Sequence, residues 1–130
     1  MESNLLATIV LLHLAISVVH GRAHTGAAIP LRLASTLFVY LVIIAAPLAG
    51  LALTRWRRAA GAWIVAASLG GALVFGLINH FVVPGPDHVG HVAAPWRPLF
   101  RVTALLLIAS EAAGVAVAIW SALARTRRTA

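Results

Sequence analysis

Long apolar runs separated by short polar segments make up nearly all of the chain. Four such runs lie at residues 5–22, 31–53, 60–83 and 99–123. A helix needs roughly 20 apolar residues to cross a hydrocarbon core of about 30 Å, so each run is long enough or nearly so. Pro30 and Pro98 precede the second and fourth runs, where a missing backbone N–H costs a helix little, and Pro47 should kink the second. The pattern predicts an all-α integral membrane protein, in which residues 1–130 form a single domain, a bundle of four transmembrane helices in two hairpins.

The first run could instead be a secretory leader that is removed. A leader normally begins with basic residues and ends at a cleavage site of small residues. Here the start of the chain carries Glu2 and no basic residue, and His13 interrupts the apolar stretch. No clean small-residue cleavage site follows the run. We therefore expect the first run to be a retained helix.

The composition agrees with a membrane protein. The chain is 62% hydrophobic and only 10% charged, whereas a soluble domain is about 25% charged, and its mean hydropathy is +0.98. All ten basic residues are Arg, and they give a net charge of +7. Because they stand singly or in short clusters between apolar runs, we expect them to border a lipid bilayer and not to bind nucleic acid. Cys is absent and the only Met is Met1, which excludes sulfur ligands for a metal apart from the first residue.

Four spans would place both termini and the 54–59 segment on one side, and the 21–30 and 84–98 loops on the other. The first side carries Arg55, Arg57, Arg58, Arg125, Arg127 and Arg128, and the second carries Arg22, Arg32, Arg97 and Arg101. Cytoplasmic segments of membrane proteins are enriched in basic residues. The bias predicts that both termini are inside and that the outer loop is 84–98. We expect a protein of a prokaryotic cytoplasmic membrane.

Ionisable side chains gather at the predicted outer side. The ends of the first and third runs and the 84–98 loop carry five of the six histidines and one of the three acidic residues: His20, His24, His80, Asp87, His88 and His91. Imidazole and carboxylate are common ligands of Zn²⁺, Cu²⁺ and non-haem iron. We therefore predict one divalent transition metal on this side. Asp87 would be a ligand, or it would orient a ligating imidazole.

The spacing of these histidines suggests how a site could form. His20 and His24 are four residues apart and share one face if the first helix continues that far. His88 and His91 are three apart, in a loop stiffened by prolines. We favour His80, His88 and His91 as the nucleus of the site, completed by His20 or His24. The alternative is that all of them are interfacial polar residues hydrogen-bonded to backbone and water.

Two ionisable residues fall at the predicted centre of the membrane. His13 lies midway along the first run and Glu111 midway along the fourth. A charge at that depth is costly and normally faces the bundle interior with a partner. We expect His13 and Glu111 to pair, with Tyr40 as a possible third member. The pair would either fix helix packing or contribute to a proton path or a second tier of ligands.

The sequence leaves several functions open. The first is a small membrane protein with a metal site on its outer face, used for redox chemistry, sensing or metal handling. The second is a b-type cytochrome, in which His20 and His80 would bind haem iron and the outer Arg side chains would hold the propionates. The third is a non-catalytic subunit of a homo-oligomer or of a larger membrane complex. Whether the protein is an enzyme is left undecided.

Overall fold

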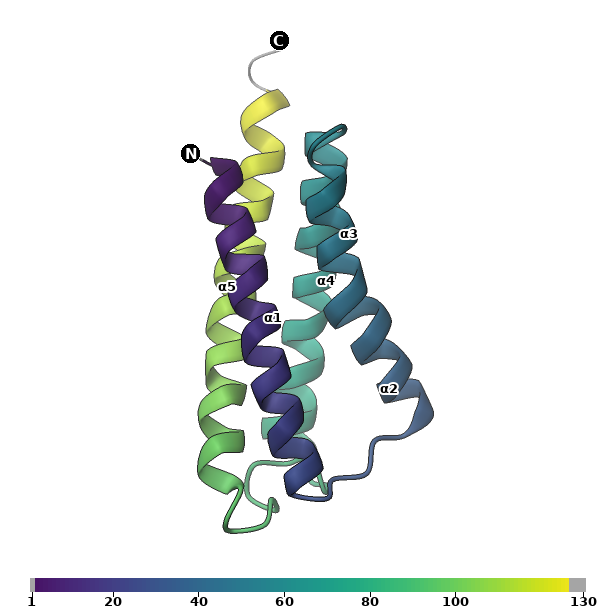
Figure 1. The fold of residues 1–130 in the computed structure, drawn as a ribbon, viewed down its shortest axis with the longest axis vertical. Helices are drawn as coiled ribbons and strands as arrows, with labels where there is room; N and C mark the ends of the chain where they lie inside the picture. The colour runs from purple at the N-terminus through teal and green to yellow at the C-terminus, as the bar shows by residue number, and fades with distance from the viewer. Residues whose placement is uncertain (1, 127–130) are drawn as a thin grey trace.

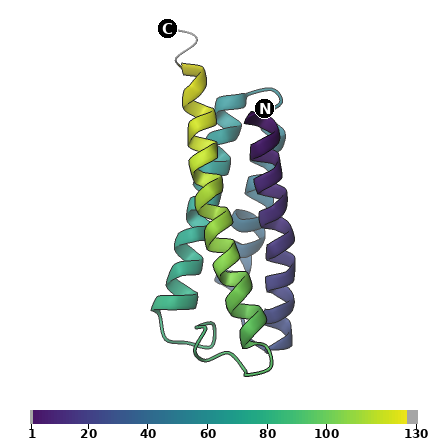
Figure 2. The same ribbon diagram turned by 90° about the vertical axis from the view of Figure 1, so that its left-hand side faces the viewer.

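Four helical rods run side by side and antiparallel along the length of the molecule (Figure 1, Figure 2). The computed structural model describes residues 2–126. In chain order the elements, where η marks π-helix, are α1 (Glu2–Gly26), α2 (Leu33–Phe38), η1 (Val39–Ala45), α3 (Ala46–Leu53), α4 (Arg58–Leu77), η2 (Ile78–Val82) and α5 (Arg97–Thr126). The elements α2, η1 and α3 form one continuous rod, as do α4 and η2. The all-helical prediction is confirmed, and the described part of the chain contains no strand.

Each rod contains a segment long and apolar enough to cross a membrane. These segments are Asn4–Gly26, Leu33–Leu53, Arg58–Val82 and Arg97–Ala124. They agree with the four apolar runs, although the ends differ. The largest difference is at the end of α1, which continues to Gly26 instead of ending near residue 22. Because of this extension, His24 lies on the same helix as His20.

The core lies between α1, α4 and α5. It consists of small and medium side chains: Leu6, Val10, Val65, Ala66, Leu69 and Ala118. Gly114 of α5 makes room for Leu69 of α4, because a Cβ at this glycine would overlap the Leu69 side chain. Close approach through small residues is how helices associate in lipid, where burial from water provides no driving force.

The second rod is packed unevenly. Its inner part, α3, lies close against α4, because Gly50 and Gly61 face each other and a Cβ on either would meet the other's carbonyl oxygen. Its outer part leans away from the bundle (Figure 1). No residue of α2 or η1 is buried. Pro47 lies next to Ala46, where the rod changes from π-helix to α-helix. The sequence predicted a kink at this proline, and the irregularity found beside it is this change of helix type.

The connections lie at opposite ends of the bundle. The turn between α3 and α4 lies at the same end as the start of α1 and the end of α5, and both other loops lie at the far end (Figure 1). We call this far end the outer end, following the predicted orientation. Arg127 and Arg128 lie outside the described residues, and the orientation in a membrane stays a prediction.

The loop between η2 and α5 folds back over the helix ends. Val89 N–H donates to the carbonyl of His80 at 2.9 Å. Val92 is buried with Phe100 of α5 and Ala23 of α1, and Trp96 packs beside them. These contacts tie α1 to α5 at the outer end and so fix the histidines of α1 relative to the loop.

Candidate metal centre

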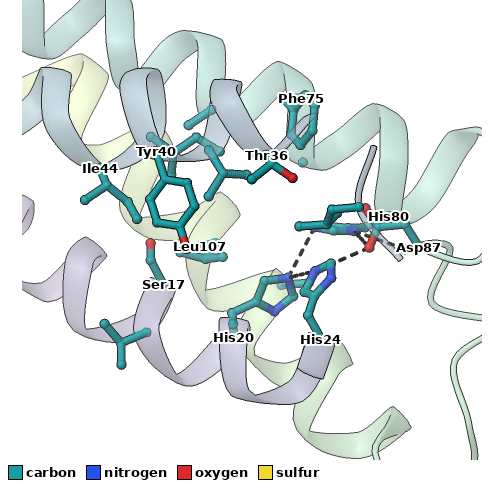
Figure 3. Close-up of a pocket in the computed structure, with 18 of the residues that line it drawn as sticks. Ser17, His20, His24, Thr36, Tyr40, Ile44, Phe75, His80, Asp87 and Leu107 are labelled. Atoms are coloured by element: carbon teal, nitrogen blue, oxygen red, sulfur yellow. Dashed lines mark hydrogen bonds and ion pairs between the residues drawn. The ribbon is translucent and has the colours of Figure 1, made fainter. Parts of the chain in front are cut away.

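Three imidazoles converge at the outer end of the bundle: His20 and His24 from α1, and His80 from η2 (Figure 3). One ring nitrogen of each lies within 4.8 Å of the other two. His20 Nε2 is 3.3 Å from His80 Nε2 and 3.2 Å from His24 Nε2. His20 and His80 are each 6% exposed. Residues 60 positions apart thus form one buried cluster that could hold a metal ion.

The local structure explains this convergence. His20 and His24 are one turn apart on α1, so their side chains emerge from the same face. His80 lies in η2, at the end of the third rod. A π-helix is rare and is frequently found at functional sites. The ring of Phe100 packs against all three imidazoles, with ring centroids 4.7 Å from His20, 5.0 Å from His24 and 5.1 Å from His80.

Hydrogen bonds restrict which nitrogens of His20 and His80 carry protons. His80 Nδ1 lies 3.1 Å from the carbonyl oxygen of Asp87, which can only accept, so neutral His80 presents an unprotonated Nε2. His20 Nδ1 lies 2.8 Å from the hydroxyl of Thr103, and this hydroxyl also lies 2.7 Å from the carbonyl of Leu99. When the hydroxyl donates to Leu99, it accepts from His20 Nδ1–H and His20 also presents an unprotonated Nε2; when it donates to His20 Nδ1, the His20 proton is on Nε2.

In the first of these tautomers the two Nε2 lone pairs face each other across 3.3 Å. Buried polar atoms are normally paired, and a contact between two acceptors is unfavourable. A cation, either an additional proton or a metal ion, would bond to both nitrogens. In the second tautomer, His20 Nε2–H donates to His80 Nε2.

Asp87 supplies a negative charge beside the imidazoles. Its Oδ1 is 3.3 Å from His24 Nε2 and 3.4 Å from His80 Nδ1, and it makes no hydrogen bond of its own among the described residues. Burial alone would raise the pKa of this carboxyl, but the adjoining His80 and the charges of His24 and His20 lower the pKa below its usual value. Asp87 is therefore a carboxylate at neutral pH. It contacts the proton-bearing side of His80, which places it as an orienting group for that imidazole.

The structure does not bring His88 and His91 into this cluster. Their rings pack against each other at 5.2 Å. His88 Nδ1 accepts from Gly90 N–H at 3.1 Å, and His91 Nδ1 donates to the carbonyl of Gly85 at 2.8 Å. Both side chains thus stabilise the loop. This agrees with the alternative interpretation of these two histidines, in which they are hydrogen-bonded to the backbone. The predicted nucleus shares only His80 with the cluster found here.

Other polar side chains at the outer end have contacts or surroundings of their own. Asn79, which precedes His80, donates to the carbonyl of Phe75 in the same rod at 2.8 Å. The side chains of Arg22, Arg32, Arg97 and Arg101 are exposed. Sequence reasoning did not identify Thr103 or Phe100. The sequence contained only a weak indication of their role: the two residues are one turn apart at the outer end of the fourth run, level with His20.

The expected mid-membrane pair is present as a close contact. His13 Nδ1 lies 3.7 Å from Glu111 Oε1, and the two residues are 0% and 3% exposed. His13 Nε2 lies 3.3 Å from the carbonyl oxygen of Ile43. That carbonyl has no α-helical donor, because the residue four positions later is Pro47. His13 therefore donates from Nε2 and presents an unprotonated Nδ1 to Glu111.

A cavity of about 690 Å³ connects the two polar regions. Its wall includes the imidazoles of His20, His24 and His80 at one end and Glu111 further along. Most other lining side chains are apolar and come from all four rods. Tyr40 extends from η1 across this space toward Ser17 of α1 (Figure 3). The histidine cluster is thus buried from water but faces an apolar chamber.

No protein-family model, no curated protein and no solved structure matches this chain. The geometry of the site therefore carries the functional argument.

Proposed function

We propose that this chain is an integral membrane metalloprotein that binds one divalent transition-metal ion through His20, His24 and His80. The observation that carries the proposal is the convergence of three imidazoles, with the Nε2 atoms of His20 and His80 3.3 Å apart. A metal ion between these two nitrogens would bond to the lone pairs of both. The carboxylate of Asp87 adds a negative charge that favours a cation.

The spacing of the nitrogens supports a metal over a proton. Zinc–imidazole bonds are about 2.0–2.1 Å, so two ligands of a tetrahedral ion lie about 3.3–3.4 Å apart. The Nε2 atom of His20 is 3.3 Å from that of His80 and 3.2 Å from that of His24, and the ligand atoms of all three imidazoles lie within 4.8 Å of one another. A shared proton would need only one such pair. Three converging imidazoles are suited to Zn²⁺, Cu²⁺ or Fe²⁺, the borderline ions that nitrogen ligands prefer.

Three protein ligands leave one coordination position free, as in metal sites that react with water or substrate. His20, His24 and His80 line the cavity, so the free position would face it. This favours metal-dependent chemistry on a molecule in the cavity over a closed structural site. With both termini inside, as the Arg bias predicts, the metal would lie near the outer membrane surface.

The haem alternative is less well supported. Two axial nitrogens must lie about 4 Å apart, at roughly 2 Å from the iron, with a flat macrocycle between them. His20 and His80 are closer than this, and the His24 ring lies 4.8 Å from that of His20 and 5.7 Å from that of His80. Of the outer Arg side chains, Arg97 donates from Nε to the carbonyl of Val92 at 3.0 Å. A Soret band in protein supplied with haem, lost on His20→Ala, would nevertheless favour this reading.

The test is metal content and metal geometry. Protein purified without chelator is dialysed against Zn²⁺, Cu²⁺, Fe²⁺ or Co²⁺ in turn, and bound metal is measured by mass spectrometry. We expect one ion per chain. We also expect Co²⁺ to give the intense visible absorption of a four-coordinate ion, because the distances from His20 Nε2 to the other two imidazoles match those between tetrahedral ligands. Absence of stoichiometric metal under all four conditions would reject the proposal and favour an accessory subunit, for which co-purification of a partner is the check.

Thr103 provides a sharper prediction. Thr103→Val keeps the shape of the side chain but removes the acceptor that holds the proton on His20 Nδ1. Loss of such an orienting group typically weakens metal affinity about 10–100-fold. We expect that decrease for Zn²⁺, measured by competition with a chromophoric chelator. Thr103→Ser retains the hydroxyl and should bind nearly as tightly as the wild type; equal affinity in all three proteins would contradict the assigned role.

A further inference from the structure

The chamber beside the histidine cluster has features of a binding site in its own right. We propose that it binds an uncharged, lipid-soluble molecule with a carbonyl or hydroxyl head group, which enters from the bilayer. This goes beyond the metal site, because the argument rests on the cavity and on polar groups that do not touch the three imidazoles.

The position of the cavity restricts the occupant to a lipid-soluble molecule. Its wall is built from residues within the four membrane-crossing segments, together with residues of the α1–α2 loop and Asp87. One side of it is formed by η1, in which no residue is buried. The outer part of that rod leans away from α1 (Figure 1). The chamber is therefore bordered on this side by the bilayer and not by packed protein.

The size and lining of the chamber suit a ligand with an apolar body. Small-molecule sites typically measure about 300–1,000 Å³, and this cavity measures about 690 Å³. Leu14, Ile43, Ile44, Leu107 and Ile108 contribute to its wall. None of the described residues that line it is Arg or Lys. No guanidinium or ammonium group lines the chamber to hold an anionic head group.

Polar groups inside the chamber indicate that it receives more than a hydrocarbon chain. Tyr40 is 63% exposed, and its hydroxyl makes no hydrogen bond with any described residue. A hydroxyl in hydrocarbon without a partner is unfavourable. Ser17 donates to the carbonyl of His13 at 2.8 Å, so its oxygen can still accept a hydrogen bond. Glu111 lines the same space. A carbonyl or hydroxyl head group would satisfy Tyr40 and could also reach Ser17 or Glu111.

Both π-helical segments of the described chain border this chamber. Val39, Tyr40, Ile43 and Ile44 come from η1, and His80 comes from η2. π-helical turns are rare and are frequently found at functional sites. Two such segments facing one cavity place the irregular backbone where a ligand would bind.

The test uses a decyl-substituted benzoquinone as the probe, with full-length protein in detergent treated with EDTA. Because the metal is absent, failure of this proposal is distinguishable from failure of the metal site. Quinone retained per chain after gel filtration is measured over a concentration series. We expect saturable binding of one molecule per chain. Decylbenzene, which lacks the polar head, should compete at least about tenfold more weakly, since even one hydrogen bond contributes a factor of this order.

Variants locate the probe. A Cβ at Gly21 meets no atom within 4 Å, and Gly21 lines the cavity, so Gly21→Phe should fill the chamber without disturbing the helix. We expect it to weaken quinone binding more than tenfold, and Tyr40→Phe to weaken it about three- to tenfold. Leu12→Phe adds a ring at a position on α1 that is 53% exposed and outside the cavity, and should bind like the wild type. Equal binding by all four proteins, or equal competition by decylbenzene, would overturn the proposal.

Discussion

The His80→Ala protein is expected to retain no stoichiometric metal after loading with Zn²⁺ and desalting, whereas the wild type should retain one ion per chain. His80 is the only one of the three clustered imidazoles that does not come from α1, and its Nε2 faces that of His20 at 3.3 Å. Removing a direct ligand should exceed the roughly 10–100-fold loss caused by removing an orienting group. Its loss would leave only two imidazoles, one turn apart on α1.

The matched control is the His88→Ala/His91→Ala double variant. It removes two imidazoles from the adjacent loop, and neither belongs to the cluster. We expect wild-type metal content, measured by mass spectrometry on the same preparations, with a modest loss of thermal stability because both side chains bond to the loop. If the double variant loses the metal and His80→Ala keeps it, the loop histidines hold the ion and the assigned site is wrong.

The fold followed from the sequence because its signal is long and redundant. Each apolar run offers about 20 residues of similar character, so no single position decides whether a helix forms. The ends of the helices were less predictable. The sequence after residue 22 of α1 contains His24, Thr25 and Gly26, which do not look like a membrane span, yet the helix continues through all three.

The histidine cluster was predicted only in part, because the helix ends could be placed from the sequence but the path of the loop could not. Helix hairpins bring the ends of successive rods together, so the gathering of histidines at one end could be expected from the positions of His20, His24 and His80. The path of the loop between η2 and α5 could not be expected in this way. His88 and His91 form hydrogen bonds with the loop backbone. The conformation of that loop depends on the packing of Val92 with Phe100 and Ala23. That packing joins residues far apart in the sequence.

The role of Thr103 could not be inferred from composition either. A threonine in an apolar helix usually bonds to its own backbone, and Thr103 does so with Leu99. When the hydroxyl donates to Leu99, its oxygen can also accept from His20 Nδ1–H. Pro47 of the second rod is a comparable case. It was expected to kink the helix, and its additional effect is to leave the Ile43 carbonyl free for His13.

The contact between His13 and Glu111 leads to the second large effect, on stability. His13 Nδ1 makes no hydrogen bond among the described residues, and in Glu111→Leu it also loses its 3.7 Å contact with the carboxyl. In His13→Leu, both Glu111 and the Ile43 carbonyl lose their contact with the imidazole. An unsatisfied polar or ionisable group in the interior of a membrane protein costs roughly a few kcal/mol. We expect both variants to melt at lower temperature than the wild type in detergent, with His13→Leu the more destabilised because it strands two groups.

Two further variants decide whether the residues act as a pair. Glu111→Gln should be nearly as stable as the wild type, since its amide can donate to His13 Nδ1. In the His13→Leu/Glu111→Leu double variant the carboxyl is also removed, and only the Ile43 carbonyl stays without its donor. Its loss of stability should therefore be smaller than the sum of the two single losses. The measurement is the free energy of unfolding from denaturant titration in one detergent for all five proteins, and strictly additive losses would show that His13 and Glu111 do not depend on each other.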